Sequence, residues 1–187
     1  KGIGNIVHFE SKALEVSEEV AAANLYQEFV RKVIPEEQIA ALQTNLHRNS
    51  AVLAALEKDC GIDSDSVTKF KIGWDAALKR VVFPVYDRFE QCVNLRLYKL
   101  PSHRKKDGSE DHLKVINAKG YGGCDLFSWP LFLSFEIDKP VFVMPSEKEM
   151  ILGIQGGLQC VCATAGELSW PSDATEFFDG FEIYIVA

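Results

Sequence analysis

The stretch PVFVMPSEKEMILGIQGGLQCVCA, residues 140–163, decides the fold class of this chain. It begins with the apolar run PVFVM (140–144), continues through a segment of helical spacing (146–154) and ends in a second apolar run, QCVCA (159–163). Apolar runs that alternate with a helical segment are typical of a strand–helix–strand unit with parallel, buried strands. The run FEIYIVA (181–187) predicts a further strand, so we expect a parallel sheet covered on its faces.

Upstream of this unit the sequence predicts antiparallel strands. VVFPVYD (81–87) and CVNLRLYKL (92–100) are rich in β-branched and aromatic residues and are separated by the polar RFEQ, which favours a hairpin or meander. Pro84 predicts an edge position or a bulge. An exposed loop from Pro101 to His112 then precedes a strand in LKVIN, residues 113–117.

The first third of the chain has helical periodicity. We expect a helix over 16–34 that Pro35 ends, a second over 36–49, a third over 50–60 capped by Ser50, and a short fourth that opens at Ser64 or Asp65. The predicted fold class is therefore α/β, with a helical lead-in (1–75), a small basic mixed β subdomain (76–135) and a mainly parallel subdomain (136–187).

Composition limits the class of protein. The chain has 187 residues, of which 47% are hydrophobic and 25% charged, which is typical of globular proteins and sufficient for one large core or two small ones. Its five cysteines include no C-x-x-C pair, so we expect neither a zinc ribbon nor a disulfide framework, and a reducing cytoplasmic location. No segment predicts a membrane span or a signal peptide.

Charge is unevenly distributed along the chain. The net charge is −7, yet residues 69–119 hold 12 basic and 6 acidic side chains, whereas residues 1–68 hold 6 and 11 and residues 120–187 hold 2 and 10. A positive segment between two negative ones suits a surface that binds a polyanion. A lysine-rich solvated loop around His103–Lys106 explains part of the same excess, and the charges alone do not separate the two interpretations.

Two groups of polar residues are candidates for a site. Glu147 and Glu149 follow a predicted buried strand, where carboxylates can hold a divalent ion or move a proton, although acidic residues also favour the first turn of any helix. Basic residues with tyrosines between them suit a single-stranded nucleic acid, and a solvated sheet face is the alternative. The basic residues are Arg80, Arg96, Lys99, Lys114 and Lys119, and the tyrosines are Tyr86, Tyr98 and Tyr121.

Particular phrases of the sequence match a known pattern. They are F-x-x-G (70–73), the basic residue Arg80 before an F-P pair (83–84), and a K-V-x-N phrase with Lys114 and Asn117. With the strand–helix–strand unit that follows, they resemble the catalytic core of Toprim-type DNA primases, particularly primase-like proteins of phages and mobile elements. The resemblance extends from about residue 39 to residue 187.

The resemblance implies a role and a site. It implies a nucleotidyltransferase that synthesises primers with Mg²⁺ or Mn²⁺, with single-stranded DNA and nucleoside triphosphates as partners and a replicative helicase as a further one. The polar residues of the basic segment, including Asn117, would face the template strand and the incoming nucleotide, and Glu147 and Glu149 would be the catalytic acids. The metal ligands remain unknown.

The sequence departs from the family pattern at two places. The family opens its Toprim part with E-G-x-x-D, whereas this chain has Pro145 in place of the leading Glu and Glu149 in place of the Asp. The family's D-x-D motif would follow a strand such as 181–187, so we expect the chain to be truncated before it. Enzymatic activity is therefore left open. One alternative is a degenerate Toprim module that binds nucleic acid or another protein as a scaffold, and another is a Toprim nuclease or topoisomerase.

Overall fold

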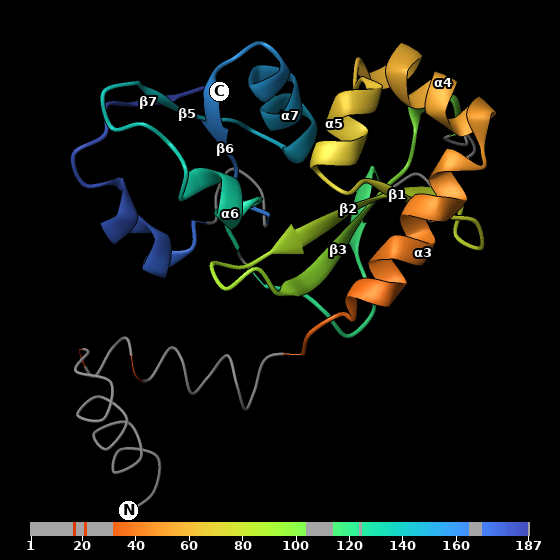
Figure 1. Ribbon diagram of the computed structural model, residues 1–187, viewed down its shortest axis with the longest axis horizontal. Coiled ribbons are helices and arrows are strands. Elements are labelled where there is room, and N and C mark those ends of the chain that lie inside the picture. The colour runs from red at the N-terminus through yellow and green to blue at the C-terminus, as the bar shows by residue number, and fades with distance from the viewer. Residues whose placement is uncertain are drawn as a thin grey trace, which may run out of the picture. The chain divides into compact units, whose positions relative to one another are not determined.

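The computed structural model describes Ser17, Ala21 and residues 32–103, 114–123, 125–164 and 170–186, without the side chains of Ser172 and Asp173. Residues 34–187 form one unit, whose elements are labelled in Figure 1. Most of the helix predicted over 16–34 and most of the loop after Pro101 lie outside the described residues. Residues 32–34 are described and are not helical, so the prediction that the helix continues to Pro35 is wrong. Among the described helices, none has the length and apolar character needed to cross a membrane.

Three helices open this unit. They are α3 (Glu36–His47), α4 (Ser50–Cys60) and α5 (Ser64–Lys69), as the periodicity predicts. The cap of α4 lies one residue earlier than predicted, whereas α5 begins at Ser64, one of its two predicted starts. Asn49, not Ser50, accepts a hydrogen bond from the Val52 N–H at 3.2 Å, and Asp63 caps α5 through the Ser66 N–H at 2.7 Å. A left-handed glycine, Gly61, ends α4 with φ 75°.

The antiparallel sheet has the order β1-β2-β3-β4. Its strands are β1 (Gly73–Asp75), β2 (Arg80–Tyr86), β3 (Cys92–Tyr98) and β4 (Val115–Asn117). The predicted hairpin is confirmed, because β2 and β3 pair antiparallel, and the strand predicted in LKVIN is β4. Strand β1 has only three residues and is not among the predicted strands.

Pro84 does not lie on an edge strand, because β2 has a partner on each side. However, β1 pairs only with residues 80–82, so beyond Val82 the proline faces no β1 residue. The ladder also shifts register between Val85 and Tyr86. No β1 residue therefore requires a hydrogen bond from Pro84, which has no N–H to donate. The register shift lies next to Pro84, close to where a bulge was predicted.

Gly73 of the F-x-x-G phrase allows α3 to approach β1 closely. A Cβ atom at Gly73 would lie 2.6 Å from Leu42 Cβ and 2.9 Å from the Leu42 carbonyl carbon. The helix therefore rests directly on backbone, which explains the glycine by packing alone.

The parallel sheet has the order β6-β5-β7. Its strands are β5 (Val141–Val143), β6 (Gln159–Val161) and β7 (Ile183–Ile185), and both pairs are parallel, as predicted. Helix α7 (Glu147–Gln155) connects β5 to β6, and the short α6 (Trp129–Phe132) precedes the sheet. A 3₁₀ segment, η3 (Ser172–Phe178), precedes β7.

The expectation that this sheet is covered on its faces fails at β7. Its three residues are exposed, with Ile183 at 44% and Ile185 at 80%. By contrast, Val141 in the central strand is buried. The apolar pattern of β7 therefore does not correspond to burial among the described residues.

The pairing of β2 with β3 fixes which side chains face which helices. Val82 and Leu97 pair directly and belong to the cluster around Ile39 of α3. Phe83 pairs with Arg96 and belongs to the other cluster, which includes residues of α7. Because side chains opposite each other in a sheet point to the same face, the register directs Arg96 toward α7.

Candidate functional site

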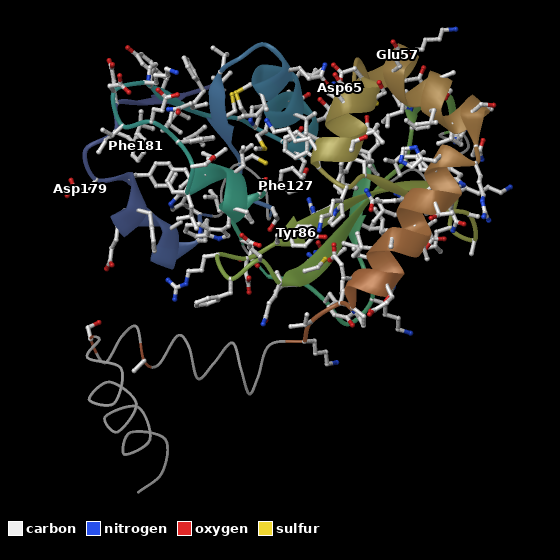
Figure 2. All side chains as sticks on the ribbon, viewed as in Figure 1. Glu57, Asp65, Tyr86, Phe127, Asp179 and Phe181 are labelled. Carbon is white, nitrogen blue, oxygen red and sulfur yellow. The ribbon has the colours of Figure 1, made fainter. Side chains whose placement is uncertain are left out.

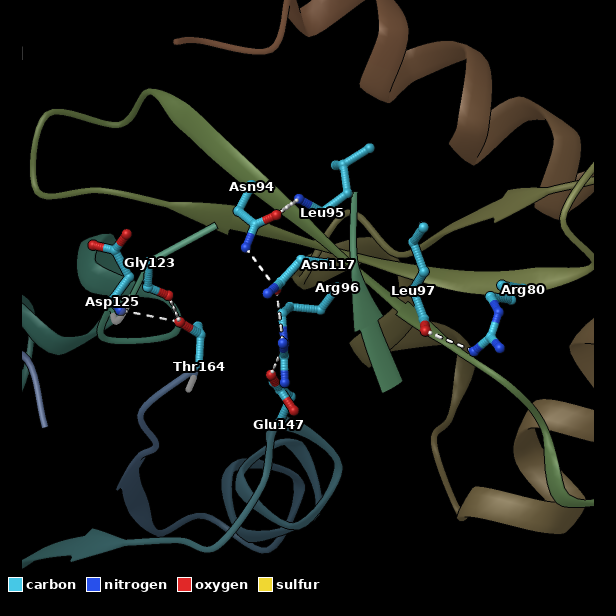
Figure 3. A network of polar contacts seen from close by, with 10 residues as sticks. All are labelled: Arg80, Asn94, Leu95, Arg96, Leu97, Asn117, Gly123, Asp125, Glu147 and Thr164. Atoms are coloured by element: carbon cyan, nitrogen blue, oxygen red, sulfur yellow. Dashed lines mark hydrogen bonds and ion pairs between the residues drawn. The ribbon is translucent and has the colours of Figure 1, made fainter. Parts of the chain in front are cut away.

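Arg96 and Asn117 lie opposite each other on β3 and β4. The Arg96 Nη1 donates to Asn117 Oδ1 at 2.7 Å, and Asn94 Nδ2 donates to the same oxygen at 2.9 Å. Asn94 is two residues before Arg96 and shares its face. Its own Oδ1 accepts the Leu95 N–H at 2.8 Å, so the amide that orients Asn117 is itself held by backbone (Figure 3).

Glu147 joins this network from the first turn of α7. The Arg96 Nε donates to Glu147 Oε1 at 2.6 Å, and the two side chains are only 14% and 6% exposed. The positive end of a helix dipole favours a carboxylate at this position. A nearly buried ion pair therefore connects the antiparallel sheet with the helix that follows β5 (Figure 3).

Glu149, the second predicted acid, lies outside this pair. Its Oε1 pairs with Lys148 Nζ at 3.1 Å. Its Oε2 and the Ser146 Oγ are buried and have no hydrogen-bond partner among the described residues. At the start of α7, the Glu147 carboxylate therefore binds Arg96, whereas the Glu149 carboxylate has one oxygen that accepts no hydrogen bond from the described residues.

Cys162 directly follows β6 and lies near the carboxylates of Glu147 and Glu149. Burial raises the pKa of its thiol well above the usual range, and the Glu147 carboxylate raises that pKa further while Arg96 opposes it. The thiol therefore stays protonated at neutral pH and is a core residue, in agreement with its place in the apolar cluster.

A second polar network fastens the segment that follows β4, at Gly123 and Asp125, to the residues that follow β6. The Thr164 Oγ1 accepts the Asp125 N–H at 3.0 Å and donates to the Gly123 carbonyl at 3.3 Å. The Thr164 N–H also donates to the Asp125 carbonyl at 2.8 Å. Figure 3 shows this network beside the Arg96–Glu147 pair, at the carboxyl end of the parallel strands, where such sheets carry their functional groups.

The structure separates the other predicted basic residues. Arg80 is 4% exposed and its Nη1 donates to the Leu97 carbonyl at 3.1 Å, and Lys99 is 3% exposed. Lys114 and Asn117 are exposed, so neither lies in the core. The candidate site thus unites Arg96, Asn117 and Glu147, but not Arg80 or Lys99. Lys114 directly precedes β4 and so lies at the other end of that strand from Asn117.

Sequence reasoning missed Asn94, Asp125 and Thr164. A signal for Asn94 was present, because it is two residues from Arg96 on a predicted strand and so had to share its face. No sequence signal pairs Asp125 with Thr164, since 39 residues separate them.

A cavity of about 360 Å³ lies near β2 and α5. Lys69, Lys71 and the rings of Phe70, Tyr86 and Phe127 are among its lining residues, and Figure 2 labels Tyr86 and Phe127. Lys71 is not free, because it pairs with Glu36. Glu36 also accepts a hydrogen bond from the Tyr86 hydroxyl. Burial raises the pKa of Tyr86, and the Glu36 carboxylate raises that pKa further. Tyr98, another of the interleaved tyrosines, is buried against Phe83.

The described residues do not fit a divalent metal site. No group of three or more His, Cys, Asp and Glu side chains comes together in this part of the chain. Glu147 is bound to Arg96, which leaves Glu149 as the carboxylate with an available oxygen at the start of α7. Divalent ions in proteins prefer several oxygen ligands, so the Mg²⁺ or Mn²⁺ implied by the resemblance stays a prediction.

Comparison with known proteins gives matches of structure but not of sequence. No family model and no curated protein matches the chain. The zinc-binding and RNA polymerase domains of the Aquifex aeolicus primase superpose with a TM-score of 0.55 and 15% identity, over 96% of this chain and 56% of that one. The E. coli primase catalytic core has a TM-score of 0.60 and 16% identity, over 80% and 59%.

A DnaG primase catalytic domain solved with bound single-stranded DNA is similar to the same degree. It has a TM-score of 0.60 and 17% identity, and the match covers 80% of this chain and 58% of that one. This chain therefore spans less than two thirds of each of these structures. At such identities the likeness concerns the fold, and the chain has the mixed α/β fold of a primase catalytic core.

Proposed function

We propose that this chain is a primase-like module of DNA replication that binds single-stranded DNA. The observation that carries the proposal is the Arg96–Asn117–Glu147 network, which places the Arg96 guanidinium beside Asn117, the exposed last residue of β4. Guanidinium and amide groups donate hydrogen bonds to backbone phosphates. The same segment, residues 69–119, has the excess of basic residues.

The proposed division of labour follows the predicted subdomains. Residues 76–135 would contact the phosphates through Lys114, Asn117 and Arg96, and residues 136–187 would supply the acids that border the strand. Nucleoside triphosphates and a replicative helicase are further partners that the resemblance predicts. The fold shared with primase cores supports this assignment.

A binding role is favoured over catalysis by two features. Pro145 stands where the resemblance expects a glutamate, and proline can neither move a proton nor bind a metal. Glu147 is two positions further along and is bound to Arg96 at 2.6 Å. We therefore propose a nucleic-acid-binding scaffold that retains the primase fold.

The test measures binding of a fluorescein-labelled oligothymidylate by anisotropy at several salt concentrations. Lys114→Gln should weaken binding and make the plot of log K against log salt shallower by about 0.7, the value for one lost single-strand phosphate contact. Lys139→Gln is the matched control, because Lys139 is also exposed but lies in the acidic third and pairs with Glu136. We expect this control to behave like the unaltered chain.

Three results would change the proposal. An equal slope in Lys114→Gln and the unaltered chain would remove Lys114 from the interface. No binding at any salt concentration would overturn the proposed function. Template-dependent synthesis that Glu147→Gln abolishes would give Glu147 a catalytic role in place of the scaffold role.

A further inference from the structure

The Arg96 guanidinium already has an anionic partner. Its Nε donates to Glu147 at 2.6 Å and its Nη1 to Asn117 at 2.7 Å, so two of its five N–H donors are used within the protein. The carboxylate cancels the charge that would attract a polyanion. A strand of nucleic acid that approached this surface would meet a neutral pair.

A carboxylate and a phosphate bind a guanidinium in the same geometry. Both accept parallel N–H donors from it, and both form short charge-assisted hydrogen bonds. We propose that Glu147 is an internal competitor of nucleic-acid phosphate for Arg96, and that binding exchanges one anion for the other. This inference rests on the proposed function, and it identifies the event that regulates binding at that site.

The surroundings of Glu147 allow it to lose Arg96. It is the first residue of α7, where the helix dipole stabilises a negative charge. Next to it in the sequence are the Ser146 hydroxyl, which has no hydrogen-bond partner among the described residues, and Lys148, a cation that pairs with Glu149 at 3.1 Å. The displaced carboxylate would therefore not be left in an apolar environment.

Arg96 is likewise placed to change partners. It is 14% exposed, and its Nη1 contact is to Asn117, an exposed residue of β4, which lies at the edge of the sheet. Asn117 can orient the guanidinium from the solvent side while Glu147 leaves from the protein side. An incoming phosphate thus needs to displace one contact rather than enter the core.

The decisive variant is Glu147→Gln, studied in the full chain. Glutamine keeps an oxygen that can accept the Arg96 Nε–H, so the arginine stays in place, but the guanidinium charge is no longer cancelled. The affinity for labelled oligothymidylate should rise about tenfold at low salt, which corresponds to about 1.4 kcal/mol. The salt plot should become steeper by about 0.7, as one additional phosphate is bound.

Two variants separate this effect from a general change in charge. Glu149→Gln removes the same charge from the same helical turn but frees Lys148 instead of Arg96, so its gain should be clearly smaller. The double variant Arg96→Met/Glu147→Gln removes both charges of the pair and should abolish the gain. The double variant is preferable to Arg96→Met alone, which would leave a buried carboxylate without its partner.

Each outcome decides the inference. If the unaltered chain binds DNA but Glu147→Gln binds equally or more weakly, the inference is overturned while the proposed function stands. A gain that Glu149→Gln matches, or that persists in the double variant, also overturns it. If the unaltered chain does not bind, the proposed function fails and the inference fails with it.

A measurement on the unaltered chain covers the case in which Glu147→Gln does not fold. The Arg96 Nε–H resonance reports the partner of that proton and can be followed by NMR while oligothymidylate is added. An exchange of carboxylate for phosphate should shift it in proportion to the bound fraction. A resonance that stays fixed at saturation would overturn the inference.

Discussion

The Arg96–Glu147 pair contributes little to the stability of the fold. A guanidinium and a carboxylate that are 14% and 6% exposed each lose several kcal/mol of hydration on folding, and their mutual attraction approximately offsets that loss. Apolar side chains of similar size would serve stability equally well. The presence of the pair is therefore not explained by its contribution to stability, which leaves room for the binding role that we propose for Arg96.

Asn49 offers a test of the structure at a single residue. Its side chain accepts the Val52 N–H at the start of α4, whereas Ser50 is the first residue inside the helix and is exposed. Asn49→Ala should lower the free energy of unfolding by about 1 kcal/mol, the usual cost of losing an N-cap. Ser50→Ala should change it by less than about 0.5 kcal/mol, as expected for an exposed site.

Urea unfolding of the two variants measures both values. A greater loss in Ser50→Ala than in Asn49→Ala would show that the serine is the cap, as the sequence predicts. Asn and Ser are both strong N-cap residues, so two adjacent candidates cannot be ranked without the backbone angles.

The members of the site could be predicted individually, but their contact could not. Arg96, Asn117 and Glu147 all stand out in the sequence by charge or position. Their meeting depends on the register that directs Arg96 toward α7, and 51 residues separate Arg96 from Glu147. Arg80 and Lys99 were predicted to bind nucleic acid but are buried. The sequence of a strand does not show which of its two faces another element covers.

Gly153 determines how closely α7 packs on β6. A Cβ atom there would lie 2.4 Å from the Cys160 Sγ, although glycine inside a helix normally costs about 1 kcal/mol relative to alanine. Gly153→Ala should therefore destabilise the protein by about 1–3 kcal/mol, the usual range for overpacking. Without the contact, the same substitution would stabilise the helix.

The control for this prediction is the change made in a Cys160→Ala background, which removes the sulfur. There Gly153→Ala should cost clearly less or become stabilising, and urea unfolding of the four proteins gives the interaction free energy. Equal costs in both backgrounds would contradict the close approach of α7 and β6.

Elements with strong periodicity could be predicted, and elements set by their neighbours could not. Helix α7 and strands β2, β3, β5 and β6 agree with the apolar pattern to within a few residues. β1 has three residues, too few for a period, and is a strand because it pairs with β2 and lies against α3. Local sequence carries no record of such pairing.

For the molecule as a whole, the fold class followed from the sequence, but the coverage of its sheets did not. Alternating apolar runs predicted parallel strands, and both pairs of the sheet are parallel. The same apolar character predicted burial of β7, whose side chains are exposed among the described residues. Apolar character shows what a strand can bury, but not whether another segment covers it.

The exposed edge strand β7 has a consequence for the colloidal behaviour of the protein. Among the described residues no further strand pairs with its outer edge, and the apolar side chains of Ile183 and Ile185 are exposed there, which favours pairing between molecules. Repulsion between chains of net charge −7 opposes that pairing at pH 7. The repulsion vanishes near the isoelectric point of about 5.1.

Reversible association should therefore be greatest near pH 5 and weaker at pH 7, as light scattering can measure. Ile185→Lys should reduce the association at pH 5, because a lysine on an edge strand blocks further pairing. Exposed Leu78→Lys is the matched control, since it adds the same charge away from β7. Equal scattering by the two variants would place the contact elsewhere, whereas a specific effect of Ile185→Lys would make acidity a control on the solubility of this protein.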